Sequence, residues 1–192
     1  MMEEVLNAPS GFLIARRGIF TPAELNAIEA LGDSLAPRKA ELAGRNDNTD
    51  HLRITRVAWM ERNAQTRWLF ERVEQTVLDL NARFYKYDLY GLVEDLQYTV
   101  YYGDEGGHYS WHVDTGPTNL QPRKISLTLQ LSEPSGYDGG ELILQAGEGP
   151  SQAQKMRGTL VTFPSYVMHR VTPVTAGIRK SLVAWVAGPK FR

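Results

Sequence analysis

The sequence of 192 residues contains no cysteine. This absence excludes disulfide bonds, thiolate zinc sites, iron–sulfur clusters and cysteine nucleophiles, and it fits a reducing compartment. The chain also lacks any run that approaches the roughly 18 apolar residues of a membrane-spanning helix. Its first residues, Met1-Met2-Glu3-Glu4, are acidic where a secretory signal would be basic. We therefore expect a cytoplasmic protein without a membrane partner.

Neither sign of charge is in excess. Lys and Arg number 21 and Asp and Glu number 22, so the formal net charge is −1. This balance lacks the basic stripe of a dedicated nucleic-acid binder, and a nucleic-acid partner is disfavoured. Hydrophobic residues make up 42% of the chain and charged residues 22%, as in an ordinary globular protein. A chain of this length is expected to form one core, and we predict a single domain over residues 1–192.

The first helix signal lies near residue 21. Thr21-Pro22-Ala23-Glu24 is a capping-box pattern with proline at the first helical position. It predicts a helix over residues 22–34. Ile28, Leu31 and Leu35 would form the inner face of this helix, because they recur at helical spacing.

A second helix is predicted over residues 64–84. Apolar residues recur there at helical spacing: Trp68, Leu69, Val73, Val77, Leu80 and Phe84. The segment 36–52 is polar and is predicted to be a surface loop. Residues 1–90 are therefore expected to be a helix-rich support for the rest of the chain.

After Leu92 the pattern changes to short apolar segments separated by glycine-rich turns. These segments lie near 95–102, 124–132, 140–145, 158–163, 167–174 and 179–187. In one of them, Ile125, Leu127 and Leu129 alternate with polar residues, which predicts a strand with one apolar and one polar face. Short strands at this spacing are typical of an antiparallel sandwich or barrel. The predicted class is mainly β with flanking helices.

Three residues of this β region form a candidate metal site. On a strand His112 and Asp114 project to the same side, while Val113 faces away. His169 follows 57 residues later in sequence, with room for intervening strands to bring it alongside. Two histidines and one carboxylate with open positions are typical of non-haem Fe(II) oxygenases. Ligand type alone leaves zinc, manganese and nickel open as alternatives.

Arg179 favours iron among these metals. An organic co-substrate that chelates the metal by a 2-oxo acid group would need a cation for its far carboxylate, and arginine offers a planar, bidentate one. Lys180 is the alternative clamp, but strand alternation would turn it the other way. A lone His-x-Asp pair in a globular protein is mostly accidental, so the prediction depends on the ordered combination. His51 and His108 are expected to be structural or surface residues.

Longer motifs surround these residues. The run from Tyr102 to Asp114 reads Tyr-Gly-Asp-Glu-Gly-Gly-His-Tyr-Ser-Trp-His-Val-Asp. Asp138-Gly139-Gly140-Glu141-Leu142 and Phe163-Pro164-Ser165 follow, and the run from His169 to Val174 completes the set. Over residues 92–192 the sequence resembles the 2-oxoglutarate/Fe(II)-dependent dioxygenases of the prolyl 4-hydroxylase-like branch, in particular the bacterial PKHD-type hydroxylases.

The resemblance implies a double-stranded β-helix, a variant of the jelly roll, with the metal in its mouth. It implies that His112, Asp114 and His169 are the iron ligands and that Arg179 holds the distal carboxylate of 2-oxoglutarate. The resemblance further implies three residues around the co-substrate: Tyr102, Gln130 and Trp185. Gln130 is a departure, since relatives often carry tyrosine at its position, and Tyr101 competes with Tyr102.

The implied reaction is hydroxylation of an unactivated C–H bond, using O2 and releasing succinate and CO2, with ascorbate as an optional reductant. By analogy the substrate is a prolyl or peptidyl compound, either a peptide or a small molecule. Segments 103–110, 115–123 and 36–52 are predicted to face it. Arg123 or Lys124 would hold an acidic substrate unless they are merely solvated. The rival functions are a cupin-like metal-dependent isomerase or hydrolase and a non-catalytic jelly-roll binding module.

Overall fold

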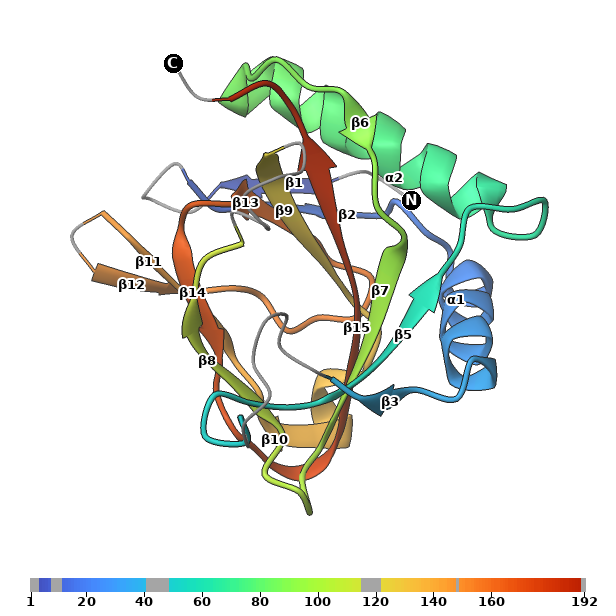
Figure 1. The fold of residues 1–192 in the computed structure, drawn as a ribbon, viewed down its shortest axis with the longest axis vertical. Coiled ribbons are helices and arrows are strands. Elements are labelled where there is room, and N and C mark those ends of the chain that lie inside the picture. Colours follow the sequence, from blue (N-terminus) through green and yellow to red (C-terminus); the bar gives the residue numbers. More distant parts are fainter. Residues whose placement is uncertain (1–3, 8–11, 41–48, 115–121, 148, 191–192) are drawn as a thin grey trace.

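The computed structural model describes residues 4–7, 12–40, 49–114, 122–147 and 149–190. The described strands all belong to two antiparallel sheets that face each other (Figure 1). The predicted class, mainly β with flanking helices, is therefore confirmed. In this described part no helix is long and apolar enough to cross a membrane.

The main sheet has ten strands, and its central path combines strands from both halves of the sequence. That path runs β1 (Glu4–Asn7), β2 (Ile14–Arg17), β13 (Leu160–Pro164), β9 (Arg123–Gln130), β15 (Val174–Ala187), β7 (Leu96–Tyr102), β5 (Arg56–Met60) and β3 (Arg38–Lys39). Two short strands, β10 (Tyr137–Gly139) and β6 (Gly91–Leu92), pair with β15 as well. The single domain over residues 1–192 stays a prediction.

The smaller sheet has five strands and carries most of the candidate metal site. Its order is β12 (Gly149–Gln152), β11 (Leu142–Ala146), β14 (Met168–Val171), β8 (His108–His112) and β4 (Arg53–Ile54). Each of the six β segments predicted after Leu92 contains an observed strand.

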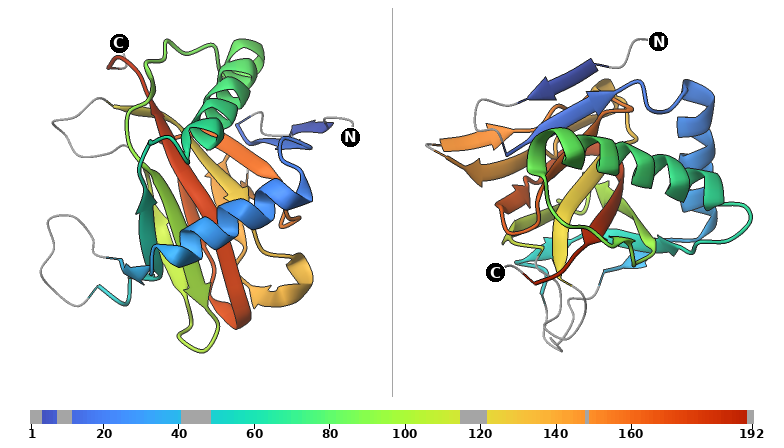
Figure 2. Two further views of the ribbon diagram at one scale, coloured as in Figure 1. Left: turned by 90° about the vertical axis from the view of Figure 1, so that its right-hand side faces the viewer. Right: turned by 90° about the horizontal axis from the view of Figure 1, so that it is seen from above.

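Two α-helices cover the face of the main sheet that is turned away from the small sheet (Figures 1 and 2). Helix α1 spans Pro22–Ser34, as predicted, and its capping box is formed in both directions between Thr21 and Glu24. Ile28 is buried and Leu31 is partly buried against the core, but Leu35 is exposed. The prediction for Leu35 was wrong because this residue is the C-cap, beyond the last helical turn.

Helix α2 spans Arg67–Leu80 and continues as one π-helical turn, η1, over Asn81–Tyr85. The predicted start at residue 64 was too early. The side-chain oxygen of Asn63 accepts hydrogen bonds from the backbone N–H groups of Gln65 and Thr66, which holds these residues in a turn before the helix begins. A short 3-10 helix, η2, spans Pro134–Gly136.

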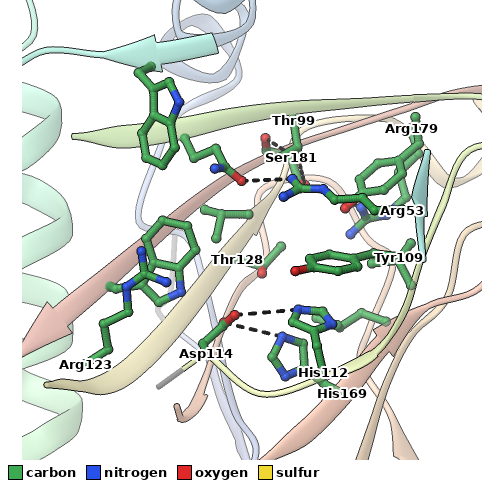
Figure 3. Close-up of a pocket in the computed structure, with 17 residues that line it drawn as sticks. Arg53, Thr99, Tyr109, His112, Asp114, Arg123, Thr128, His169, Arg179 and Ser181 are labelled. Atoms are coloured by element: carbon green, nitrogen blue, oxygen red, sulfur yellow. Dashed lines mark hydrogen bonds and ion pairs between the residues drawn. The ribbon is translucent and has the colours of Figure 1, made fainter. Parts of the chain in front are cut away.

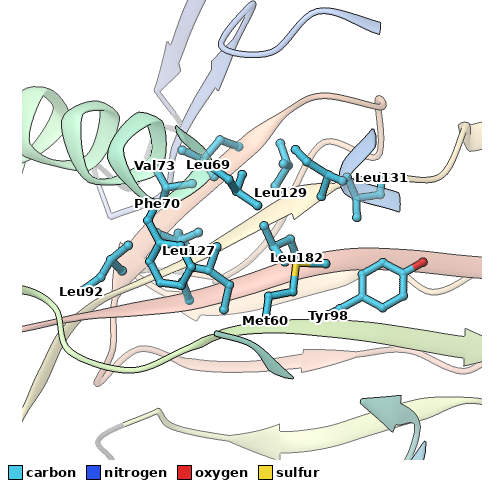
Figure 4. Packing of buried hydrophobic residues seen from close by; sticks show 14 of the residues in the cluster. Met60, Leu69, Phe70, Val73, Leu92, Tyr98, Leu127, Leu129, Leu131 and Leu182 are labelled. Atoms are coloured by element: carbon cyan, nitrogen blue, oxygen red, sulfur yellow. The ribbon is translucent and has the colours of Figure 1, made fainter. Parts of the chain in front are cut away.

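The two helices pack on the apolar face of the main sheet to form the larger hydrophobic core. Figure 4 shows the part of this core that lies against α2. Leu69, Phe70 and Val73 of α2 contribute to it, together with Leu127 of β9 and Leu182 of β15, all of which are at most 2% exposed. The helical periodicity of α2 and the alternation of the strands therefore meet in one layer.

The description of residues 1–90 as a helical support was incomplete. Strands β1 to β5 come from this segment, and four of them join the main sheet. They are two to five residues long, too short to give a clear alternating pattern. Segment 36–52, predicted to be a loop, contains β3 and a turn at 50–52, and its residues 41–48 lie outside the described ones.

The other predicted substrate-facing loops are also revised. Residues 103–110 are not one loop, because β8 begins at His108 after a turn. Of segment 115–123, residues 115–121 lie outside the described residues, and β9 begins at Arg123.

Candidate active site

A cavity of about 210 Å³ lies between the two sheets, and its walls are set by strand alternation. Arg179, Ser181, Val183 and Trp185, at alternate positions of β15, all line it. The intervening Lys180 and Leu182 face the helices. Alternate residues of β7 (Gln97, Thr99 and Tyr101) line the same cavity. The main sheet therefore presents a polar face to the cavity and an apolar face to the helices.

His112, Asp114 and His169 are brought together on the opposite wall (Figure 3). His112 on β8 pairs directly with His169 on β14, so both imidazoles face the same side. One ligand atom from each of the three residues lies within 4.8 Å of the others. The Asp114 carboxylate is 3.6 Å from Nε2 of His112 and 3.4 Å from Nε2 of His169. The three predicted ligands thus form a compact set.

Asp114 lies beyond the end of β8, so strand alternation alone does not place it. Its backbone N–H donates to the carbonyl oxygen of Ser165 (2.8 Å). The hydroxyl of Ser126, on the cavity side of β9, donates to its Oδ2 (2.8 Å). These two contacts orient the carboxylate towards the imidazoles.

Both imidazoles are held with Nε2 towards the carboxylate. Nδ1 of His112 is 2.8 Å from the carbonyl oxygen of Ser110, and Nδ1 of His169 is 2.9 Å from that of Val167. A carbonyl oxygen can only accept, so in neutral rings the proton resides on Nδ1 and the lone pair on Nε2. This is the second-sphere arrangement that metal-binding histidines use.

The protonation states at this cluster suit a cation. Burial lowers the pKa of His112 to about 4, and the neighbouring His169 contributes in the same direction. Burial by itself would raise the pKa of Asp114, but the attraction of its carboxylate to the His169 and His112 rings, when these are protonated, holds the pKa below its usual value. A neutral imidazole and an ionised carboxylate are the forms that bind metals. The donor set therefore fits a divalent ion such as iron.

Arg179 faces the same cavity and is 1% exposed. One guanidinium nitrogen donates to Oε1 of Gln130 (3.1 Å) and another lies 3.4 Å from the hydroxyl of Ser181. Its Nε has no hydrogen-bond partner, and among the described residues no carboxylate lies within ion-pair distance of the group. A buried guanidinium without a counter-ion is costly, so the site is suited to an anion.

Gly140 makes room for Arg179. A Cβ atom at Gly140 would lie 2.9 Å from Cδ of Arg179, and the residue has a φ of +64°, which favours glycine. The Gly139-Gly140 pair is therefore both a turn and part of the wall behind the arginine.

Lys180, the alternative clamp, points to the other face. Its Nζ is 3.0 Å from Glu29 and 2.8 Å from Asp33, both on α1. The alternation argument that favoured Arg179 over Lys180 holds in the structure.

The choice of Tyr102 over Tyr101 was wrong. Arg179 lies directly opposite Tyr101 in the antiparallel pairing of β15 with β7, and residues that are paired in this way share a face. Tyr101 is 3% exposed and lines the cavity, with the guanidinium of Arg179 at 5.2 Å from its ring centre. Tyr102 faces the helix side, where Arg56 covers its ring.

Trp185 lines the cavity, whereas Gln130 lies behind its wall. Gln130 is buried and contacts Arg179, so it supports the arginine and is not part of the cavity lining. Trp185 lines the cavity, with the guanidinium of Arg123 3.7 Å from its ring centre and the Trp59 ring 6.2 Å away.

The two residues predicted to hold an acidic substrate, Arg123 and Lys124, lie in different environments. Arg123 lines the cavity, but Glu94 already binds it through two contacts of 2.6 and 2.5 Å. Lys124 is buried outside the cavity lining. Neither is an unpaired cation. His51 and His108 are outside the metal cluster, as expected, and Nδ1 of His108 lies against the carbonyl oxygen of Gly106.

Arg53 and Tyr109 are among the cavity residues that sequence reasoning missed. Arg53 lies on the two-residue strand β4, directly opposite Tyr109. The Tyr109 ring stacks on His112 at a centroid distance of 3.5 Å. Tyr109 and His112 are three residues apart and would face opposite sides of a regular strand, but the register shifts between β8 and β14 and brings both into the cavity. The local sequence pattern does not predict this bulge.

Comparison with known proteins agrees with the geometry. Residues 96–187 match the family model of the 2OG-Fe(II) oxygenase superfamily. A PKHD-type hydroxylase of Rippkaea orientalis is 30% identical over 172 residues, which cover 88% of this chain and 75% of that protein. A PKHD-type hydroxylase of Stenotrophomonas maltophilia is 44% identical over 86 residues, but there the match spans only 38% of the relative's length.

Solved structures share the fold. A prolyl-4-hydroxylase from Pseudomonas putida is similar with a TM-score of 0.73 over 93% of both chains, at 20% identity. A prolyl hydroxylase from Trichoplax adhaerens, solved with a peptide of the hypoxia inducible factor, has a TM-score of 0.76 over 93% of this chain and 84% of that one, at 19% identity. These likenesses confirm the predicted double-stranded β-helix. The family model and the Rippkaea orientalis relative, which matches most of the chain's length, show that the chain belongs to the 2OG-Fe(II) oxygenase superfamily, among the relatives of the PKHD-type hydroxylases.

Proposed function

We propose that the protein binds Fe(II) through His112, Asp114 and His169 and 2-oxoglutarate through Arg179. The observation that carries this proposal is the position of Arg179, an almost fully buried cation without a carboxylate partner among the described residues, on the wall of the cavity that holds the triad. A bidentate guanidinium is suited to the distal carboxylate of a dicarboxylic 2-oxo acid.

When bound, the iron with 2-oxoglutarate and O2 supplies the oxidising power to hydroxylate an unactivated C–H bond, with release of succinate and CO2. The residues of the chain position the reactants and exclude water. Tyr101, with Arg179 over its ring, and Val183 form apolar parts of the wall. Trp185 and Trp59 are placed to contact a substrate at the open side, since Trp59 is 44% exposed.

We further propose a prolyl or peptidyl substrate, either a peptide or a small molecule. The support is the likeness to PKHD-type hydroxylases and to structures named as prolyl hydroxylases. Fold and metal site do not by themselves fix a substrate, so this part depends on analogy. Ascorbate as a reductant stays a prediction.

The test is anaerobic titration of the protein with Fe(II) and 2-oxoglutarate, followed by visible absorption. The expected result is a charge-transfer band that is absent in His112→Ala and retained in His108→Ala, a matched histidine outside the cluster. A wild-type protein that fails to bind 2-oxoglutarate under these conditions would refute the proposal.

The two rival functions predict other outcomes. A cupin-like isomerase or hydrolase would use the three metal ligands but be indifferent to 2-oxoglutarate and O2. A non-catalytic binding module would keep its binding activity after Asp114→Ala. The unpaired Arg179 favours the oxygenase over both.

A further inference from the structure

Arg53 is a second buried cation in the same cavity. It is 8% exposed, lines the cavity wall and projects beside Tyr109, as its pairing on β4 requires (Figure 3). One guanidinium nitrogen donates to Oε1 of Gln97 (3.2 Å), and the group lies 4.5 Å from the centre of the Tyr109 ring. Its Nε is buried without a hydrogen-bond partner.

Neither contact of Arg53 carries a full negative charge. A neutral amide oxygen and the face of a phenol ring satisfy part of the guanidinium, but no carboxylate of the described residues lies within 4.0 Å of it. Asp114 is the one carboxylate among the described residues that line the cavity. Arg123, the third arginine of the wall, differs because Glu94 neutralises it. Since a buried unpaired charge is destabilising, Arg53 is suited to an anion that enters from outside.

In the proposed complex the charges of the metal, Asp114, 2-oxoglutarate and Arg179 cancel without Arg53. A divalent ion together with Asp114 has one net positive charge, and the dianion of 2-oxoglutarate reverses its sign. Arg179 then cancels the remainder. With the metal and the co-substrate in place, Arg53 is therefore the one cation of the cavity wall without a matching anion among the described residues and these bound groups.

We propose that Arg53 binds a carboxylate of the substrate, so that the molecule hydroxylated by this protein is a carboxylate-bearing amino acid or peptide. This inference rests on the proposed function, since the charge count assumes bound metal and 2-oxoglutarate. The contacts place the anion site on the side of Tyr109 that faces away from the metal cluster, because Arg53 and the His112 imidazole both contact the Tyr109 ring. The carboxylate would anchor the substrate while its reacting carbon extends towards the triad.

The carboxylate has two sources with the same chemistry: the α-carboxylate of a free amino acid or chain terminus, and the side chain of an acidic residue within a peptide. Three pairs of probes separate them. L-Proline is compared with L-prolinamide, and N-acetyl-L-proline with N-acetyl-L-prolinamide. The third pair is N-acetyl-prolyl-aspartate amide and its asparagine counterpart. A wider panel of L-amino acids and their carboxamides removes the dependence on proline.

Binding is measured by calorimetry on protein loaded with Fe(II) and 2-oxoglutarate under anaerobic conditions, so that no turnover occurs. The expected result is that at least one carboxylate binds about tenfold or more tightly than its matched amide, the size of effect that a charge-assisted hydrogen bond supplies. This preference should disappear in Arg53→Gln and in Arg53→Met, and Arg53→Lys should keep part of it.

Two further measurements keep the outcome interpretable. Thermal unfolding of each variant establishes that it is folded, and 2-oxoglutarate affinity is measured in parallel. Arg53→Gln should bind 2-oxoglutarate as wild type does, whereas Arg179→Leu should not. The inference is overturned if no carboxylate of the panel binds better than its amide, or if the folded Arg53→Gln protein keeps the preference.

The inference is also overturned if Arg53→Gln, and not Arg179→Leu, loses 2-oxoglutarate, because Arg53 would then be the co-substrate clamp. Failure of the proposed function has a different signature. In that case wild-type protein does not bind 2-oxoglutarate at all, and the comparison of acid with amide is repeated on protein loaded with metal alone.

Discussion

The two faces of the main sheet are equally buried but opposite in chemistry. On β9, Leu127 and Leu129 pack under the helices, while Ser126 and Thr128 face the small sheet. All four are at most 7% exposed. Burial therefore does not distinguish core from site here. What distinguishes them is polarity, since buried polar and charged groups are costly unless they bind something. The helix-covered face holds the fold together, and the cavity face holds reactants.

The largest expected effect comes from loss of a metal ligand on the cavity wall that faces the main sheet. His169→Ala removes one imidazole from the cluster, and formation of succinate from 2-oxoglutarate should fall to the background of metal-free protein, because two ligands hold the metal far more weakly than three. Stability should change little. The measurement is succinate formation together with bound iron after dialysis. His108→Ala is the control, and undiminished iron in His169→Ala would contradict the assignment.

The second-largest effect is expected on the helix-covered face of the main sheet. Leu182→Ala, in a side chain that is fully buried under the helices, should lower the free energy of unfolding by about 2 to 5 kcal/mol. The next residue, Val183, lines the cavity, and Val183→Ala should lower the free energy of unfolding clearly less. Denaturant unfolding of the two variants measures the difference. Equal losses would mean that the two faces contribute alike to stability.

The third prediction concerns acid. In metal-free protein the pKa of His112 is about 4, whereas a histidine in the unfolded chain has a pKa near 6.5. Between these values the unfolded chain binds more protons, so stability is full above about pH 6.5 and falls as the pH drops towards 4. The loss attributable to this residue is on the order of 3 kcal/mol at most. The lowered pKa of Asp114 acts in the same direction at still lower pH.

Chemical unfolding at several pH values in the presence of a chelator tests this dependence. His112→Gln should flatten the profile between pH 4 and 6.5, because the variant has no group that titrates at this position. A wild-type profile that is flat over the same range would contradict the prediction.

The smallest effect concerns a charge on the helix side. Lys180→Met removes the contacts to Glu29 and Asp33 of α1 and should cost about 1 kcal/mol or less, as partly exposed ion pairs do. Affinity for 2-oxoglutarate should be unchanged, in contrast with Arg179→Leu. A large loss of co-substrate affinity in Lys180→Met would show that the two faces are coupled through β15.

Alternation and helical periodicity, which are local, were enough to predict α1, β7, β9 and β15. They also separated Arg179 from Lys180. Residues 102–114 and 169–174 identified the family. The register in which strands pair could not be predicted. Tyr101 and Tyr102 are adjacent on a strand, and only the pairing of β7 with β15 decides which of them faces Arg179.

Arg53 could not have been found from sequence. It is one of many arginines, it lies on a strand of two residues, and its place in the cavity depends on pairing with Tyr109 56 positions later. The bulge that turns Tyr109 inward is equally a property of the assembled sheet. The cytoplasmic location stays a prediction.

Strand β15 has a consequence for how this protein can diversify. Its fourteen residues pair with four other strands of the main sheet. Adjacent positions of this one strand, such as Leu182 and Val183, contribute to different parts of the molecule. A mutation at a cavity position can therefore change what is bound while leaving the neighbouring core contacts in place. Ligand selectivity and folding are separately adjustable along a single stretch of chain, so β15 is the first place to engineer a new specificity.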